Sequence, residues 1–170
     1  MTANKPNKKI EADLFSSDTP TVLAALDRIK IEGTTSQLPL LFELLNSGAE
    51  ETVTQKILTI LGSLKVRDAV PVLAEALQDP RYKPIRKSLA TACWQNGLDY
   101  RDSFPVFVDL VIHEAWETAF EAFTVIENME HFPGKEILEQ TTDTIHSALN
   151  DAGPQKKYFL HEILSMIRSS

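Results

Sequence analysis

Three stretches of this chain share one pattern: LPLLFELL at residues 38–45, VPVLAEAL at 70–77 and FPVFVDLV at 104–111. The proline at the second position recurs after 32 and then 34 residues, and apolar residues follow it at matching places. A second apolar set downstream also aligns: Val53, Ile57 and Ile60, then Ile85, Leu89 and Ala92, then Ala119, Phe123 and Ile126. A repeat of this length indicates helical hairpins, each of which buries its apolar face only by stacking on the next. At the matched positions we predict core residues that join neighbouring hairpins: Leu41, Leu73, Ile57, Leu89 and Phe123.

Apolar residues recur three and four positions apart almost everywhere from Thr19 onward, which is typical of amphipathic helices. We therefore predict an all-α chain, with helices at Thr19–Glu32, Ser36–Asn46, Glu50–Lys65, Asp68–Gln78, Tyr82–Asn96, Ser103–Ile112, His113–Met129, Lys135–Asn150 and Gln155–Arg168. The segment Phe104–Ile112 also suits a strand by its composition, and the repeat assigns it to a helix. A short helical turn near Ile10–Phe15 fits the same pattern.

The chain is predicted to form one domain over residues 19–170, after a polar segment at 1–18. Within it we expect a capping helix at 19–33, repeats at 34–66, 67–98 and 99–132, and a degenerate capping hairpin at 133–170 that lacks the proline. Asp18 precedes Pro20 as an N-cap residue precedes a first-turn proline. Gly33, Gly48 and Gly97 follow apolar runs, where a residue in the left-handed conformation often ends a helix.

The paired helices resemble the HEAT repeat, especially the short bacterial kind. Ile85-Arg86 stands where that family usually carries Val-Arg, and Ile60-Leu61-Gly62 where it often carries Leu-Gly. The resemblance covers about Ser36 to Met129, although Val53-Thr54 and Ala119-Phe120 lack the arginine. It implies a short α-solenoid, a right-handed superhelix of about four to five hairpins whose second helices line a concave face.

Composition and charge narrow the classes of function. The chain has 170 residues, of which 43% are hydrophobic and 24% charged, and these proportions indicate a globular protein rather than a disordered one. The net charge of −7 disfavours binding to nucleic-acid backbones and to anionic membranes. The amino terminus lacks the apolar run of a signal peptide, and Cys93 is the single cysteine, so we expect a cytoplasmic location.

The sequence contains none of the short motifs that would indicate a catalytic site. The sequence holds no glycine-rich phosphate loop, no His-Glu-x-x-His and no Gly-x-Ser-x-Gly. The four histidines stand far apart in the sequence: His113, His131, His146 and His161. We therefore expect no catalytic residue, no metal and no cofactor, and we interpret Cys93 as an inert core thiol on the apolar stripe of Leu89 and Ala92.

The polar face of the second helices is the most informative feature for function. Residues spaced i, i+4, i+7 and i+11 share one helical face. That spacing gives one stripe in each repeat: Glu51, Gln55, Leu58 and Gly62, then Lys83, Lys87, Ala90 and Trp94, then Glu117, Glu121, Thr124 and Asn128. With Arg86 nearby, the middle stripe is basic and ends in tryptophan, a residue enriched at binding hot spots. We predict a groove for a protein or peptide of mixed charge, with Trp94 exposed as its anchor.

The alternative interpretation of these stripes is a solvated face with salt bridges between repeats.

The second tryptophan, Trp116, differs from Trp94 in its surroundings, because Phe120 and Phe123 follow it four and seven positions further on. That spacing predicts that these three aromatic residues lie in the core.

The most direct functional hypothesis is a non-catalytic HEAT-like adaptor or scaffold that binds another protein. One alternative is a HEAT-like DNA glycosylase or nucleic-acid-processing factor, which requires a broad basic face. The acidic stripe of Glu117 and Glu121 disfavours that alternative. The other alternative is a permanent structural subunit of a larger complex, which would expose a large apolar patch when isolated.

Overall fold

The computed structural model describes residues 7–170, which contain α-helices and short 3₁₀-helices but no strand. The earlier helices are α1 (Lys8–Leu14), α2 (Thr19–Glu32), α3 (Leu38–Asn46), α4 (Glu51–Gly62), α5 (Ala69–Gln78) and α6 (Arg86–Asn96). The later ones are α7 (Phe104–His113), α8 (Trp116–Glu127), α9 (Lys135–Leu149) and α10 (Pro154–Ser169). Three 3₁₀-helices connect them: η1 (Thr35–Gln37), η2 (Pro80–Ile85) and η3 (Arg101–Ser103). The all-α prediction is confirmed for the described residues, including a helix rather than a strand over the whole segment at 104–112.

The described chain divides into two compact units, an amino-terminal unit that ends at Leu98 and a carboxy-terminal unit, Asp99–Ser170. This junction coincides with the boundary expected between the repeats at 67–98 and 99–132. The single domain expected over residues 19–170 stays a prediction. Part of the polar segment expected at 1–18, residues 1–6, lies outside the described residues.

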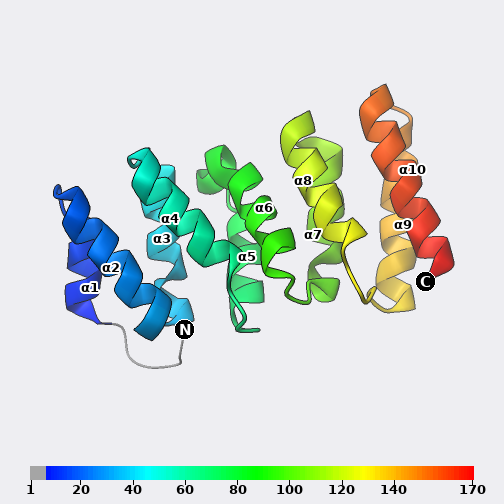
Figure 1. Cartoon of the computed structure of the whole chain (residues 1–170). Coiled ribbons are helices and arrows are strands. Elements are labelled where there is room, and N and C mark those ends of the chain that lie inside the picture. Colours follow the sequence, from blue (N-terminus) through cyan, green and yellow to red (C-terminus); the bar gives the residue numbers. More distant parts are fainter. Residues whose placement is uncertain (1–6) are drawn as a thin grey trace. The chain divides into compact units, whose positions relative to one another are not determined.

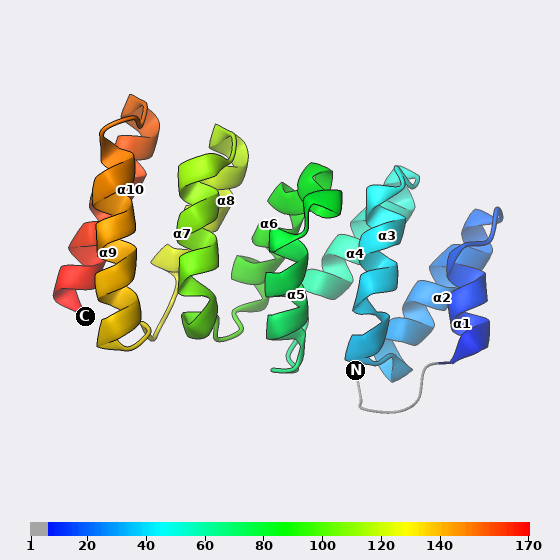
Figure 2. The same cartoon turned by 180° about the vertical axis from the view of Figure 1, so that it is seen from behind.

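The amino-terminal unit consists of three helical hairpins that pack in two layers. Helices α2, α4 and α6 contact one another in succession and form the layer at the front of Figure 1. The opposite layer, seen from behind in Figure 2, holds α1, α3 and α5, of which α3 and α5 are in contact. The core between the layers includes Leu41, Ile57, Leu73 and Leu89, all fully buried. The prediction that these matched repeat positions lie in the core is confirmed.

The carboxy-terminal unit consists of two hairpins, α7–α8 and α9–α10. Helix α7 contacts α9, and α8 contacts α10. Phe104 and Phe107 are fully buried in this core and make edge-to-face ring contacts, Phe104 with Phe132 at 5.5 Å and Phe107 with Tyr100 at 5.4 Å. Phe123 is also buried, as predicted.

The helix ends follow from local chemistry. The Asp18 carboxylate accepts a hydrogen bond from the backbone N–H of Thr21 at 3.0 Å and caps α2, as expected. Gly48 and Gly97 have positive φ angles of 75° and 63°, so their predicted left-handed conformation is confirmed. The same prediction for Gly33 is wrong, because Gly33 adopts an extended conformation with φ −70° and ψ 165°. A different constraint, close approach to Ile29, accounts for this glycine.

Candidate functional site

Helix α6 presents the central residues of the predicted site, but it begins later than predicted. The expected helix started at Tyr82, whereas α6 starts at Arg86 and the 3₁₀-helix η2 precedes it. Pro84 explains the difference, because a proline disfavours the α conformation of the residue before it. Lys83 therefore lies on η2, and it does not continue the stripe of α6.

Within α6, the predicted stripe reduces to two exposed residues. Ala90 is fully buried, so its assignment to the exposed stripe is wrong. Lys87 is exposed, and Trp94 is 37% exposed, which confirms the predicted exposure of the tryptophan. Seven residues correspond to two helical turns, so the Cα atoms of Lys87 and Trp94 lie on one face of α6 about 10 Å apart. We call these two residues the α6 strip.

A groove of about 300 Å³ runs between α4 and α6, beside the α6 strip. Its lining residues are Gln55, Leu58 and Thr59 from α4 and Lys87, Ser88, Thr91, Ala92 and Gln95 from α6. Gln55 and Leu58 belong to the stripe predicted for the first repeat, whereas Thr91 and Gln95 were not predicted. Lys87 belongs to both the strip and the groove. Side-chain amides and hydroxyls both donate and accept hydrogen bonds, so the groove offers partners for an extended peptide backbone.

Buried polar contacts fix the two walls of this groove. The Asn96 side chain is buried and donates from Nδ2 to the carbonyl oxygen of Leu61 on α4, at 3.2 Å. The ammonium of Lys65 donates to the carbonyl oxygen of Asn96 at 2.8 Å. Gly62 lies against Gln95, since a Cβ added to this glycine would lie 2.5 Å from Oε1 of that residue. These contacts hold α4 and α6 at a fixed separation before any partner binds.

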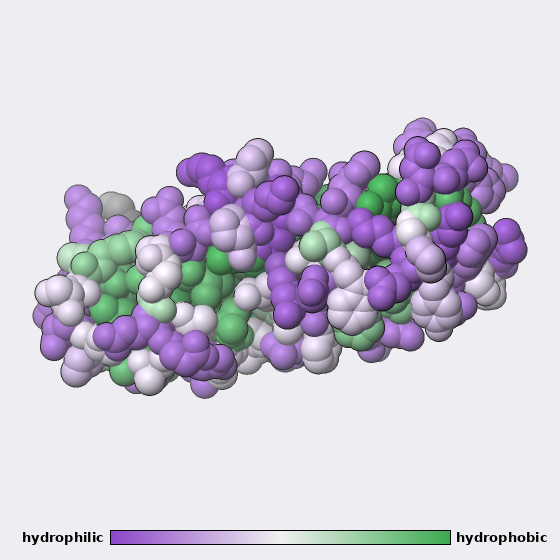
Figure 3. Space-filling model, turned by 90° about the horizontal axis from the view of Figure 1, so that it is seen from above, coloured by the Kyte–Doolittle hydropathy of each residue, from purple (hydrophilic) through white to green (hydrophobic). Residues whose placement is uncertain are grey.

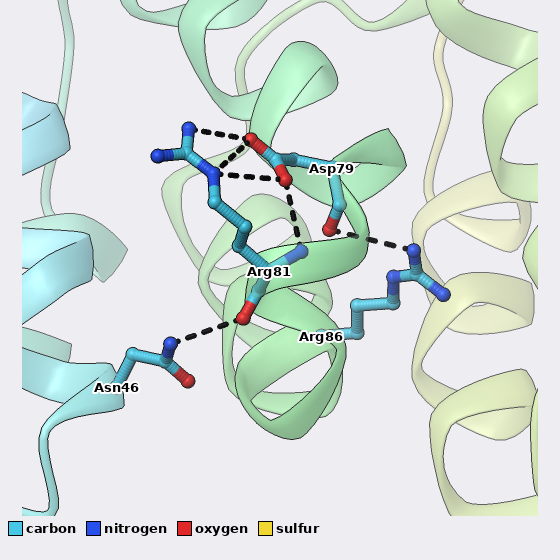
Figure 4. A network of polar contacts seen from close by, with 4 residues as sticks. All are labelled: Asn46, Asp79, Arg81 and Arg86. Carbon is cyan, nitrogen blue, oxygen red and sulfur yellow. Dashed lines mark hydrogen bonds and ion pairs between the residues drawn. The ribbon is translucent and has the colours of Figure 1, made fainter.

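A polar network anchors the segment that leads into α6 (Figure 4). Asp79 accepts hydrogen bonds from the backbone N–H of Arg81 at 2.9 Å and from its guanidinium, and the closest ion-pair distance is 2.7 Å. Asn46, at the end of α3, donates to the carbonyl oxygen of Arg81 at 3.0 Å. Arg86 is half-buried and reaches back to the carbonyl oxygen of Asp79 at 3.5 Å. Arg86 was predicted to bind a partner, and this contact gives it a structural role as well.

The network predicts a dependence of stability on acid pH. The hydrogen bond from the Arg81 side chain, then that from its backbone, lowers the pKa of Asp79 below its usual value of 3.8. A lowered native pKa contributes stability above about pH 4 that is lost as the pH falls through the native value. Asp79→Asn should therefore lose less stability between neutral and acid pH than the wild type, as measured by urea denaturation at both pH values. An unchanged difference in Asp79→Asn would contradict the assignment.

The acidic residues of the predicted site belong to the carboxy-terminal unit. Glu117 is exposed in the first turn of α8, where a negative charge is favoured by the helix dipole, and Glu121 is half-buried one turn later. Asn128 ends the helix, and its Nδ2 donates to the carbonyl oxygen of Thr124 at 2.8 Å. Glu117 and Glu121 thus share a face of α8, whereas the Asn128 amide is engaged in capping its own helix.

Two aromatic residues of α8 do not lie where the sequence placed them. Trp116 and Phe120 were expected in the core, but they are 44% and 43% exposed. The buried stripe of α8 is already formed by Ala119, Ala122, Phe123, Val125 and Ile126. Trp116 and Phe120 lie at the margin of that stripe. The sequence holds no local signal of their exposure, since fully buried Phe42 is followed by a glutamate just as they are.

Comparison with models of known protein families and with curated proteins found no match for this chain. Within residues 7–170, no group of three or more His, Cys, Asp or Glu side chains is placed to hold a metal ion. Cys93 is buried, as predicted. None of the helices described for the chain is long and apolar enough to cross a membrane. The functional proposal is therefore based on the groove between α4 and α6 and on the α6 strip beside it.

Proposed function

We propose that this chain is a non-catalytic adaptor of the HEAT-like type, a short α-solenoid whose second helices form a partner-binding face. The observation that carries the proposal is the α6 strip beside the groove between α4 and α6. It combines an aromatic side chain, an ammonium group and a row of amides and hydroxyls within one surface. The partner is a protein or peptide of mixed charge.

The chemistry of this surface suits recognition of an extended or helical peptide. Trp94 provides a large, rigid contact area, which is why tryptophan is frequent among binding hot spots. Lys87 contributes long-range attraction to an acidic group of the partner, and such charges mainly accelerate association. Gln55 and Gln95 face the same groove from the two helices. The Nε2 of Gln55 donates to the Glu51 carboxylate at 2.6 Å, which orients the side chain and leaves its amide oxygen as an acceptor for the partner's backbone.

The HEAT-like assignment is supported by equivalent packing in the amino-terminal unit. Leu41 and Leu73, which match in the repeat, are both fully buried on α3 and α5, and Ile57 and Leu89 are equally buried on α4 and α6. The second helices of successive hairpins contact one another, α2 with α4 and α4 with α6, and so do the first helices α3 and α5. The lone buried thiol is compatible with a reducing compartment, and we place the adaptor in the cytoplasm.

A permanent structural subunit is the second candidate, and exposed apolar side chains favour it. Ile31, Phe15 and Tyr158 are exposed in addition to Trp116 and Phe120. Light scattering of the isolated chain over a range of concentrations separates the two candidates. An adaptor remains monomeric, whereas a subunit deprived of its complex self-associates through its apolar surface.

Trp94→Ala should weaken binding of the native partner by about 2 kcal/mol or more, roughly 30-fold in Kd, because it removes the anchor. The partner is first captured from native lysate, then purified and titrated by calorimetry against wild type and variant. Phe15→Ala is the matched control, since it removes another exposed aromatic side chain of the same unit, in the turn between α1 and α2. Equal affinities of Trp94→Ala and wild type would contradict the proposed site.

A further inference from the structure

Helices α8 and α10 pack together and expose three aromatic side chains: Trp116 and Phe120 from α8 and Tyr158 from α10. We call these three residues the aromatic patch. Tyr158 is the most exposed, at 61%. The rings of Trp116 and Phe120 stack with their centroids 5.6 Å apart and their planes inclined by 15°. A cluster of large aromatic side chains on the surface of a protein often marks an interaction site.

Buried rings support the aromatic patch from below. Phe120 contacts the buried Phe159 at 6.1 Å, and Phe159 in turn stacks on the buried Phe123 at 4.9 Å. Tyr158 contacts Phe159 at 6.0 Å. Because Phe120 rests on a buried ring and Trp116 stacks on Phe120, these two side chains lose little freedom when a partner binds. The aromatic patch is thus a preorganised surface.

Trp116 also borders a cleft of about 710 Å³ between the α7–α8 turn and the α9–α10 turn. The apolar part of its lining is formed by Ile112, Trp116, Ala148, Ala152, Pro154 and Leu160. Lys156 ties the two turns together, because its ammonium donates to the carbonyl oxygen of Ile112 at 2.7 Å. The cleft has room for an apolar side chain of a ligand that lies across the aromatic patch.

The charge of the carboxy-terminal unit determines which ligand fits this surface. Residues 99–170 contain 13 acidic against 5 basic residues, a net charge of −8, whereas residues 1–98 contain 11 acidic and 12 basic residues. Around the aromatic patch, Glu117 follows Trp116, Glu121 follows Phe120, and Glu162 lies one turn beyond Tyr158. On the face drawn in Figure 3, hydrophilic residues dominate the carboxy-terminal helices at the right, with only small apolar areas between them.

We infer that the aromatic patch and its cleft bind a cationic segment of a partner protein, which places arginine on the rings and an apolar side chain in the cleft. A guanidinium group stacks on aromatic faces and pairs with carboxylates, and both are present here. The acidic unit adds long-range attraction for such a segment. This inference rests on the proposed function in that both assign the chain to protein binding, but it concerns a different surface from the α6 strip.

The test uses the full chain and two labelled synthetic helical peptides of equal length, one with arginine and leucine on opposite faces and one with glutamate replacing arginine. Fluorescence anisotropy should show binding of the arginine peptide that weakens between about 50 and 300 mM salt, because salt screens the attraction. The glutamate peptide should bind at least about tenfold more weakly, and Trp116→Ala and Glu117→Lys should each weaken the arginine peptide by about tenfold.

Phe15→Ala, which removes an exposed aromatic side chain outside both surfaces, serves as the control and should bind the arginine peptide like the wild type. Trp94→Ala is measured alongside it to distinguish the aromatic patch from the α6 strip. Circular dichroism establishes that each variant is folded, and if Trp116→Ala is not, the surface variant Glu117→Lys decides. Equal binding of the two peptides, or wild-type affinity in Glu117→Lys, would overturn the inference. Loss of peptide binding in Trp94→Ala alone would move the cationic site to the α6 strip and overturn it too. The native-partner titration of Trp94→Ala fails or succeeds independently of this experiment.

Discussion

Leu73→Ala should lower the free energy of unfolding by about 2–5 kcal/mol, the range for removing a large aliphatic side chain from a core that cannot collapse around the cavity. Leu73 is fully buried on α5, in the core of the amino-terminal unit. Helix α5 contacts α3 on one side and α6 on another, so relaxation at this position requires several helices to move together. The expected loss therefore lies toward the upper part of the range.

Urea denaturation measures this loss, and two further variants make it specific. Leu41→Ala, at the matching position of the preceding repeat, should cost a similar amount because Leu41 is equally buried. Leu58→Ala should cost less, since Leu58 is only half-buried at the groove. Unchanged stability of Leu73→Ala would show that the repeats have been aligned in the wrong register.

The order and type of the helices could be predicted because the repeat supplies information that no single segment holds. The segment at 104–112 illustrates this, since its β-branched and aromatic residues suit a strand. The proline and apolar positions it shares with 38–45 and 70–77 identified it as the first helix of a hairpin, and α7 is that helix. Matched positions also identified Leu41, Leu73, Ile57 and Leu89 as core residues.

Local backbone preferences explain the errors near helix starts. The predicted stripe included Lys83 and took no account of Pro84. This proline disfavours the α conformation at the preceding residue, and a 3₁₀-helix forms there.

The error at Ala90 has a different cause. Ala90 was placed on the exposed face by spacing alone, although a small apolar residue at a stripe's margin is readily covered by a neighbouring helix. Periodicity shows which residues share a face, and packing decides how much of that face is covered.

The candidate site could be predicted only in part, because periodicity gives the residues that share a face and packing decides which of them are exposed. The exposure of Trp94 followed from its departure from the buried stripe of Ala92 and Cys93. The groove beside it depends on which side chains of α4 meet those of α6, a tertiary relation that one sequence does not encode locally. The exposure of Trp116 and Phe120 likewise depends on how α10 packs against α8, because α10 covers Phe123 and leaves their rings partly open.

Gly33→Ala should destabilise the protein by about 2–3 kcal/mol, the upper part of the range for overpacking, because the added methyl group meets backbone that cannot rotate away. A Cβ at Gly33 would press on the carbonyl oxygen of Ile29 and lie 3.0 Å from the Cα of the same residue. That carbonyl already accepts the N–H of Gly33 at 2.9 Å, which fixes the close approach.

Gly134→Ala is a closely matched control for this prediction. Gly134 has φ −64° and ψ 161°, nearly the backbone angles of Gly33, and a Cβ there would meet nothing within 4 Å. Both sites have φ values that alanine adopts freely, and both substitutions restrict the unfolded chain in the same way. Gly134 is also the N-cap of α9, where alanine is less favourable than glycine, so the two effects oppose each other and Gly134→Ala should change stability by less than about 1 kcal/mol. Parallel urea denaturation of the two variants isolates the contact with Ile29. Equal stability changes in both would mean that Gly33 stands at the end of α2 for a reason other than its close approach to that turn.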